Sequence, residues 1–239
     1  MAPRFTLPKS LPASPIWSSD RGLVALLLAV LLLEFVFLPL ESSGLIGPGW
    51  IILVDVWTAG VLVAGASALG WKRLQTGIIA GGLAAVIVLL GVHIWARSVS
   101  VTWVEALRAL VAATVFSLLA ALILGQVFRA GPTTQARILG AVAAYVLLGL
   151  IFGNVFRFLH VLDERALTGI HWSPGVTNLA AYVYFSLSTL TTVGYGDILP
   201  VSLPARAVAN LEALAGQLFP AILIARLVSL ELATRPSPR

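Results

Sequence analysis

The chain has 239 residues, of which 59% are hydrophobic, only 10% are charged and none is cysteine. A soluble globular domain is nearer to about half apolar and a quarter charged, so this composition excludes an ordinary soluble domain and favours an integral membrane protein. The lack of cysteine excludes disulfides and thiolate metal sites. The net charge of +5 is spread too thinly along the chain for a nucleic-acid-binding patch.

Residues 1–21 are rich in Pro and Ser and carry Arg4, Lys9 and Arg21. The apolar run that follows is too long for the core of a signal peptide, and no small-residue cleavage site clearly follows it. We therefore expect an uncleaved cytoplasmic arm at the N-terminus.

Six later segments are apolar enough to cross a membrane, which takes ~20 residues of helix. They are residues 22–40, 51–70, 77–96, 101–128, 136–159 and 204–232. A seventh apolar stretch, 178–190, is too short to span and is typical of a re-entrant or buried helix. The expected fold class is an all-α membrane protein with six transmembrane helices and a re-entrant helix between the last two.

Positive charge indicates the orientation. The predicted outer segments hold only Arg97, Arg157, Arg165 and Arg206, whereas most other Lys and Arg residues lie at predicted inner ends. Because cytoplasmic loops carry the excess of Lys and Arg, both termini are predicted to be cytoplasmic. The compact chain without cysteine favours a plasma membrane of prokaryotic type.

The decisive motif lies between the short apolar stretch and the last span, where residues 191–197 read TTVGYGD. A dehydrated cation can be held by rings of backbone carbonyl oxygens that replace its water shell. Aiming successive carbonyls at one axis needs unusual backbone angles, which Gly194 and Gly196 allow because they lack a Cβ. Thr192 can add its hydroxyl as the lowest ligand. We expect Tyr195 to pack outward and Asp197 to lie at the outer mouth.

This motif resembles the selectivity-filter signature of the potassium-channel family, and the order helix, loop, helix over residues 136–232 resembles its pore module. The resemblance implies passive, selective K⁺ conduction. It places the ion-binding carbonyls at Thr192, Val193, Gly194 and Tyr195, with Gly196 completing the filter. K⁺ is the expected permeant ion, and no organic cofactor is expected.

One filter motif per chain cannot enclose an ion, so we expect four copies to assemble as a homotetramer with four-fold symmetry, surrounded by membrane lipid. The predicted organisation is a cytoplasmic arm (1–21), a four-helix domain like a voltage sensor (22–130), a pore domain (131–232) and a cytoplasmic tail (233–239). No nucleic-acid partner is expected.

Several residues are predicted to support the filter: Thr191, Asp197, Ser188 and Glu212. The short helix is predicted to start near Thr177 or Asn178, both good N-caps. Glu212 lies inside the last span, where a carboxylate is costly and calls for a partner. We expect that partner to be Ser188 or Thr191, with Asn210 or Gln217 as the alternative.

The last span contains Gly216 and Pro220, which together predict a gating hinge because proline removes a helix hydrogen bond. For Gly216 the alternative is close helix packing. An apolar constriction that closes by dewetting is expected near the inner end, with Leu223, Leu227 and Leu230 as candidates.

Voltage sensing needs several basic residues at every third position of the fourth span, but 101–128 holds only Arg108. One moving charge per subunit supplies at most roughly 9 kcal/mol per 100 mV over four subunits. We therefore predict weak or absent voltage dependence. Arg108 is expected to be either a residual sensor charge or part of a buried ionic cluster with Glu105, Asp55 and Glu34. The short link around Gly131-Pro132 favours packing of the four-span domain on the pore of its own subunit.

No phosphate-binding loop, metal-ligand cluster or nucleophile–base pair occurs in the sequence, so enzymatic activity is not expected. Two other functions stay open. One is a less selective cation channel, against which the intact TTVGYGD argues. The other is a non-conducting subunit that regulates a separate channel.

Overall fold

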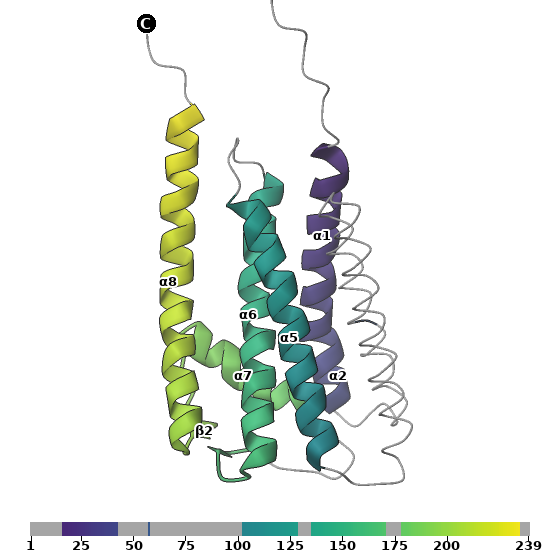
Figure 1. Cartoon of the computed structure of the whole chain (residues 1–239), viewed down its shortest axis with the longest axis vertical. Helices are drawn as coiled ribbons and strands as arrows, with labels where there is room; N and C mark the ends of the chain where they lie inside the picture. The colour runs from purple at the N-terminus through teal and green to yellow at the C-terminus, as the bar shows by residue number, and fades with distance from the viewer. Residues whose placement is uncertain (1–15, 43–56, 58–101, 129–134, 171–177, 235–239) are drawn as a thin grey trace, which may run out of the picture.

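The structure is a computed structural model, and it describes residues 16–42, 57, 102–128, 135–170 and 178–234 (Figure 1). The predicted spans 51–70 and 77–96 lie outside the described residues except for Trp57, and so do Asp55 and Thr177.

Each predicted apolar segment within the described residues is helical. The bounds agree within three residues, except that the first helix begins at Ile16, six residues before the predicted start of the first span. The elements are α1 (Ile16–Leu32), a π-helical turn η1 (Leu33–Phe37), α2 (Leu38–Ser42), α5 (Thr102–Val127), α6 (Gln135–Leu162), β1 (Leu167–Thr168), α7 (Leu179–Leu190), β2 (Leu199–Pro200) and α8 (Leu203–Thr234). By length and composition, three described stretches can cross a membrane: Trp103–Gly125, Arg137–Leu162 and Leu203–Ser229. The apolar part of the first helix, Val24–Leu40, is shorter.

Helix α6 is central, because it contacts α1, α5, α7 and α8 (Figure 1). Between α1, α5 and α6 lies a buried apolar core that also receives Val183 of α7. The fully buried members of this core include Leu26, Val30, Leu147, Leu119 and Leu150. Helices α1, α5 and α6 and the short helix α7 therefore share one packed interior.

Small residues bring α6 and α7 close together. A Cβ at Gly153 would lie 2.9 Å from Val183 Cγ2, and a Cβ at Gly149 would lie 2.6 Å from Leu187 Cδ2. The two glycines are four residues apart on α6, as are the two residues they meet on α7, so the contact follows one face of each helix. Small residues at this spacing are typical of helix contacts in membranes.

A second buried cluster holds α7 against α6 and the start of α8. Phe156 of α6 meets Phe185 of α7 edge to face, with ring centroids 4.7 Å apart. Next to this cluster, which includes Leu167, β1 pairs antiparallel with β2, so that Leu167 lies opposite Pro200. This small sheet joins the loop after α6 to the segment that directly follows residues 191–197.

Helix α1 begins and α8 ends at the same end of the molecule, opposite the sheet (Figure 1). Helix α7 runs from α8 past α6 toward α2, in the half of the molecule that carries the sheet (Figure 1). The arrangement therefore holds the TTVGYGD loop beside α8, within the depth of the helices.

Candidate functional site

The TTVGYGD loop begins where α7 ends, with Thr191 as the last residue in a helical conformation. Beyond it, every second residue has a positive φ: 60° at Thr192, 60° at Gly194 and 82° at Gly196. Alternation of right- and left-handed backbone turns successive N–H groups toward one side of the chain and leaves the carbonyls for the other. Left-handed angles are easy for the two glycines and costly for a β-branched threonine.

The N–H groups of the loop point back to the end of α7. The amides of Val193 and Gly194 both donate to the backbone carbonyl of Ser188, at 2.9 and 3.1 Å. The amide of Tyr195 donates to the side-chain Oγ of the same serine, at 3.3 Å. One residue of α7 therefore holds three consecutive amides of the loop.

The carbonyl groups of the loop have no such partners. Within the described part of the chain, no carbonyl of residues 192–196 accepts a hydrogen bond, and residues 191–197 are all exposed. Backbone oxygens are normally paired where they are buried, so this row of carbonyls in exposed residues is an unused set of acceptors. Chemically, such a row can serve as ligands for a dehydrated alkali cation.

Two hydroxyls flank the lower end of this row of carbonyls. Thr191 Oγ1 donates to the carbonyl of Leu187 at 2.6 Å, so this hydroxyl closes the end of α7. Thr192 Oγ1 instead accepts a hydrogen bond from Nε2 of Gln217 on α8, at 3.1 Å. The hydroxyl of Thr192, which the sequence predicts as the lowest ligand, is thus hydrogen-bonded to α8.

Two tyrosines lie beside the C-terminal part of the loop. The ring of Tyr195 is stacked on that of Tyr184 from α7, with centroids 5.7 Å apart and planes 8° from parallel. The side chain of Tyr184 also interacts with the carboxylate of Asp197. The loop residue therefore packs against the short helix, and the acidic residue is held near it.

Helix α7 begins after Asn178, but this residue does not cap the helix with its side chain. Asn178 has a φ of 49°, and its side chain makes no cap hydrogen bond. Its backbone carbonyl accepts from the amide of Ala181 at 3.0 Å instead. The predicted start is correct, and the predicted capping by the Asn178 side chain is wrong.

Glu212 is fully buried and meets α7 at Ser186, rather than at the predicted Ser188 or Thr191. The Ser186 hydroxyl donates to Oε1 of Glu212 and also lies 2.8 Å from the carbonyl oxygen of Gly149 on α6. Oε2 of Glu212 has no hydrogen-bond partner among the described residues. Ser188 is not available to it, because that side chain serves the loop.

Gly216 packs directly on the end of α7. A Cβ at this position would overlap the backbone of Leu190, whose carbonyl oxygen also accepts from the hydroxyl of Tyr145 at 3.2 Å. Helix α8 runs without interruption through Gly216 and Pro220. The structure therefore displays the packing role of Gly216, and the hinge stays a prediction.

Two of the gate candidates on α8, Leu223 and Leu227, are less exposed than their neighbours Ile222, Ile224 and Val228. Leu223 packs against the buried core of its own chain, and Leu227 is half-buried. The side chain of Leu230 lies outside the described residues. The apolar constriction therefore stays a prediction.

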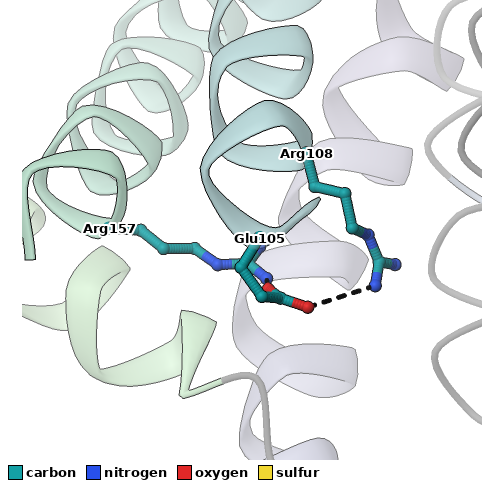
Figure 2. A network of polar contacts seen from close by, with 3 residues as sticks. All are labelled: Glu105, Arg108 and Arg157. Atoms are coloured by element: carbon teal, nitrogen blue, oxygen red, sulfur yellow. Dashed lines mark hydrogen bonds and ion pairs between the residues drawn. The ribbon is translucent and has the colours of Figure 1, made fainter. Parts of the chain in front are cut away.

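Among the described residues, the charged cluster joins Glu105 to two arginines, Arg108 and Arg157 (Figure 2). Glu105 lies between Arg108, whose Nη1 is 3.6 Å from its Oε1, and Arg157, which forms an ion pair with its Oε2. Arg157 comes from α6, so the cluster links α5 to the pore-side helices. Sequence reasoning placed Arg157 in an outer segment and missed this partner.

The predicted fourth member, Glu34, lies apart from this cluster. It is buried in η1, only 5% exposed, beside Gly149 of α6. Neither carboxyl oxygen has a hydrogen-bond partner in the described part of the chain. Asp55 lies outside the described residues.

A family model described as an ion channel matches residues 144–231. The match covers most of α6, all of α7, the TTVGYGD loop and most of α8. No curated protein and no solved structure matches the chain. The chain therefore carries an ion channel domain over these residues, together with helices long and apolar enough to cross a membrane.

Proposed function

We propose that the protein is a K⁺-selective channel that conducts ions passively through a filter formed by Thr192, Val193, Gly194, Tyr195 and Gly196. The observation that carries the proposal is that the amide and carbonyl groups of the loop differ in their hydrogen bonding. The amides of residues 192–195 are bonded to the end of α7, while no carbonyl of residues 192–196 accepts a hydrogen bond within the described chain, and these residues are exposed. That geometry supports coordination of a dehydrated cation, and the match to the ion channel model supports the same class of function.

We propose assembly as a homotetramer, with three further copies completing the ring of carbonyls. One chain supplies a single strip of ligands, which leaves most of a cation's surface uncovered. Only 11% of the α8 span is buried within the chain, against 50% of the α6 span. Apolar side chains exposed on α8 include Leu211, Leu214, Leu218 and Ile222. An apolar helix beside the filter is suited to contact further copies around a pore.

The membrane is proposed to be a plasma membrane of prokaryotic type, with both termini cytoplasmic. The start of α1 and the end of α8 lie at one end of the molecule, which agrees with termini on the same side (Figure 1). In this orientation, the end of the TTVGYGD loop that leads into β2 faces the outer side, opposite the termini.

Weak or absent voltage dependence is part of the proposal. Arg108 is buried and paired with Glu105, which itself pairs with Arg157 of α6. Moving Arg108 across the field would break this arrangement for one charge per subunit, far less than true sensors move.

The test is ion flux into liposomes that hold only this protein, with K⁺ and Na⁺ compared under the same gradient. K⁺ flux well above Na⁺ flux, abolished by Gly194→Ala, is the expected result. Gly125→Ala is the matched control, because a Cβ there meets no atom within 4 Å. Comparable Na⁺ flux would indicate a less selective channel, and no flux across pH and voltage would favour the non-conducting subunit.

A further inference from the structure

Three residues of α8, namely Glu212, Gly216 and Gln217, lie alongside the end of α7 and the start of the loop. Glu212 meets Ser186, and one turn later Gly216 meets Leu190. Positions four residues apart lie on the same face of a helix, so these two contacts align the two helices. The next residue after Gly216 is Gln217, which is thereby brought level with the first residues of the loop.

Gln217 donates a hydrogen bond to the Thr192 hydroxyl, which is the one side-chain group among the proposed ion ligands. Its Nε2 donates to Oγ1 of Thr192 at 3.1 Å, and both residues are exposed in the single chain. A threonine hydroxyl has one proton and two acceptor lone pairs, and it is free to rotate when nothing holds it. The amide of Gln217 therefore occupies one lone pair of Thr192 Oγ1, and the second lone pair points in a fixed direction.

Thr192 is also held in an unfavourable backbone conformation. Its φ of 60° is a left-handed value that β-branched residues rarely adopt. Such a conformation persists only where surrounding contacts impose it. The two contacts found here are the Thr192 amide, which donates to the carbonyl of Thr189 at 3.0 Å, and the amide of Gln217.

We infer that Gln217 is a positioning residue that orients the Thr192 hydroxyl and thereby sets the preference for K⁺ over Na⁺ at the inner end of the filter. This inference rests on the proposed function. A cation entering from the inside meets the hydroxyl first, and a ring of four fixed hydroxyl oxygens matches one ion radius. Threonine side chains that can turn about χ1 bring their oxygens closer around the smaller Na⁺, so loss of the Gln217 amide lowers discrimination more than it lowers throughput.

The first measurement compares Gln217→Leu with the wild-type chain in liposomes. Leucine fills much of the same space but donates no hydrogen bond. We expect the K⁺/Na⁺ permeability ratio to fall by about tenfold, which corresponds to about 1.4 kcal/mol. Ser229→Ala is the matched control, because it also removes one side-chain hydrogen bond on α8, to Ala225, and leaves the loop contact intact. Its ratio stays at the wild-type value.

The second measurement tests whether Gln217 acts through the hydroxyl. Thr192→Val keeps the shape and removes the hydroxyl, so adding Gln217→Leu in that background causes no further loss. In a Thr192→Ser background, which keeps a hydroxyl, Gln217→Leu still lowers the ratio. Non-additivity confined to the valine background is the signature of a shared interaction. Additive effects, or a ratio within twofold of wild type for Gln217→Leu alone, overturn the inference.

A third readout does not depend on conduction. Thermal unfolding of the purified full chain is followed at increasing K⁺ and at matched Na⁺, because an ion that binds the folded state raises the midpoint. We expect Gln217→Leu to need several-fold more K⁺ for the same protection, with little change in Na⁺. If the wild-type chain carries no selective flux, the proposed function fails, and an unchanged K⁺ requirement in this variant separately overturns the role of Gln217.

Discussion

The hydroxyl oxygen of Ser188 accepts a hydrogen bond from the backbone amide of Tyr195, at 3.3 Å. The backbone carbonyl of the same serine accepts from Val193 and Gly194. The carbonyl contacts survive any substitution of the side chain, whereas the hydroxyl contact does not. Ser188 therefore offers a way to release one amide of the loop without removing the others.

We predict that Ser188→Ala weakens K⁺ binding but leaves the protein folded. The Tyr195 amide loses its acceptor, at a cost of about 1 kcal/mol per subunit, and the adjacent carbonyl becomes less constrained. The K⁺ concentration that half-protects the chain from thermal unfolding is expected to rise. Ser117→Ala is the control, since the hydroxyl of Ser117 donates within α5, to the carbonyl of Ala113, and not to the loop. An equal response of the two variants would show that the Ser188 hydroxyl does not act on the loop.

Glu212 is predicted to be structural, through its contact with Ser186. Glu212→Gln keeps an oxygen that accepts from Ser186, so its midpoint of thermal unfolding is expected to stay near that of wild type. Glu212→Ala removes the acceptor and leaves a cavity in a fully buried position, which destabilises by about 2 kcal/mol or more. Thermal unfolding of the purified protein in detergent measures both. A glutamine variant as unstable as the alanine variant would contradict this role.

The positions of the described helices and of the loop could be predicted from the sequence, because hydrophobic length and the glycine pattern are local signals. The link between Glu212 and Ser186 could not. The sequence predicts that a buried carboxylate has a partner, but whether that partner is Ser186 or Ser188 depends on the register of two separate helices. That register is fixed where Gly216 meets Leu190, and no pattern in either segment encodes it.

Two further features lay beyond sequence reasoning for related reasons. Arg157 is 52 residues from Glu105 along the chain and pairs with it only because α5 and α6 pack side by side. The sheet of β1 and β2 has two residues in each strand, which is too short to show an alternating pattern. Both are tertiary contacts between segments whose own sequences predict nothing unusual.

Gly216 is predicted to act by close packing on α7. Gly216→Ala places a methyl group against the backbone of Leu190, so α8 must move away and the Gln217 contact is lost with it. We expect reduced thermal stability and reduced K⁺ protection. Pro220→Ala restores a helix hydrogen bond without touching α7, and should change the open fraction while K⁺ protection stays intact. If Gly216→Ala alters opening alone, the hinge interpretation is the better one.

The pair formed by Glu105 and Arg157 predicts that the four-span domain packs on the pore of its own subunit. Helices α5 and α6 contact each other along their length within one chain. Because the chain has no cysteine, Glu105→Cys with Arg157→Cys gives two unique thiols. A short bis-maleimide is expected to join them within a subunit, so denaturing gels show monomers. A ladder of covalent dimers to tetramers would indicate exchange of the domain between neighbouring subunits.

Voltage is predicted to have little effect on opening. K⁺ currents from the reconstituted protein should rise in proportion to the driving force between about −100 and +100 mV, since fewer than the usual three or four gating charges per subunit are available. Arg108→Gln should leave this relation unchanged, because Arg108 is buried and paired with Glu105 rather than free to cross the field. The variant is expected to lower thermal stability instead, as Glu105 then loses one of its two basic neighbours. A steep voltage dependence that disappears in Arg108→Gln would identify this arginine as a sensor charge and would require α5 to move relative to Arg157.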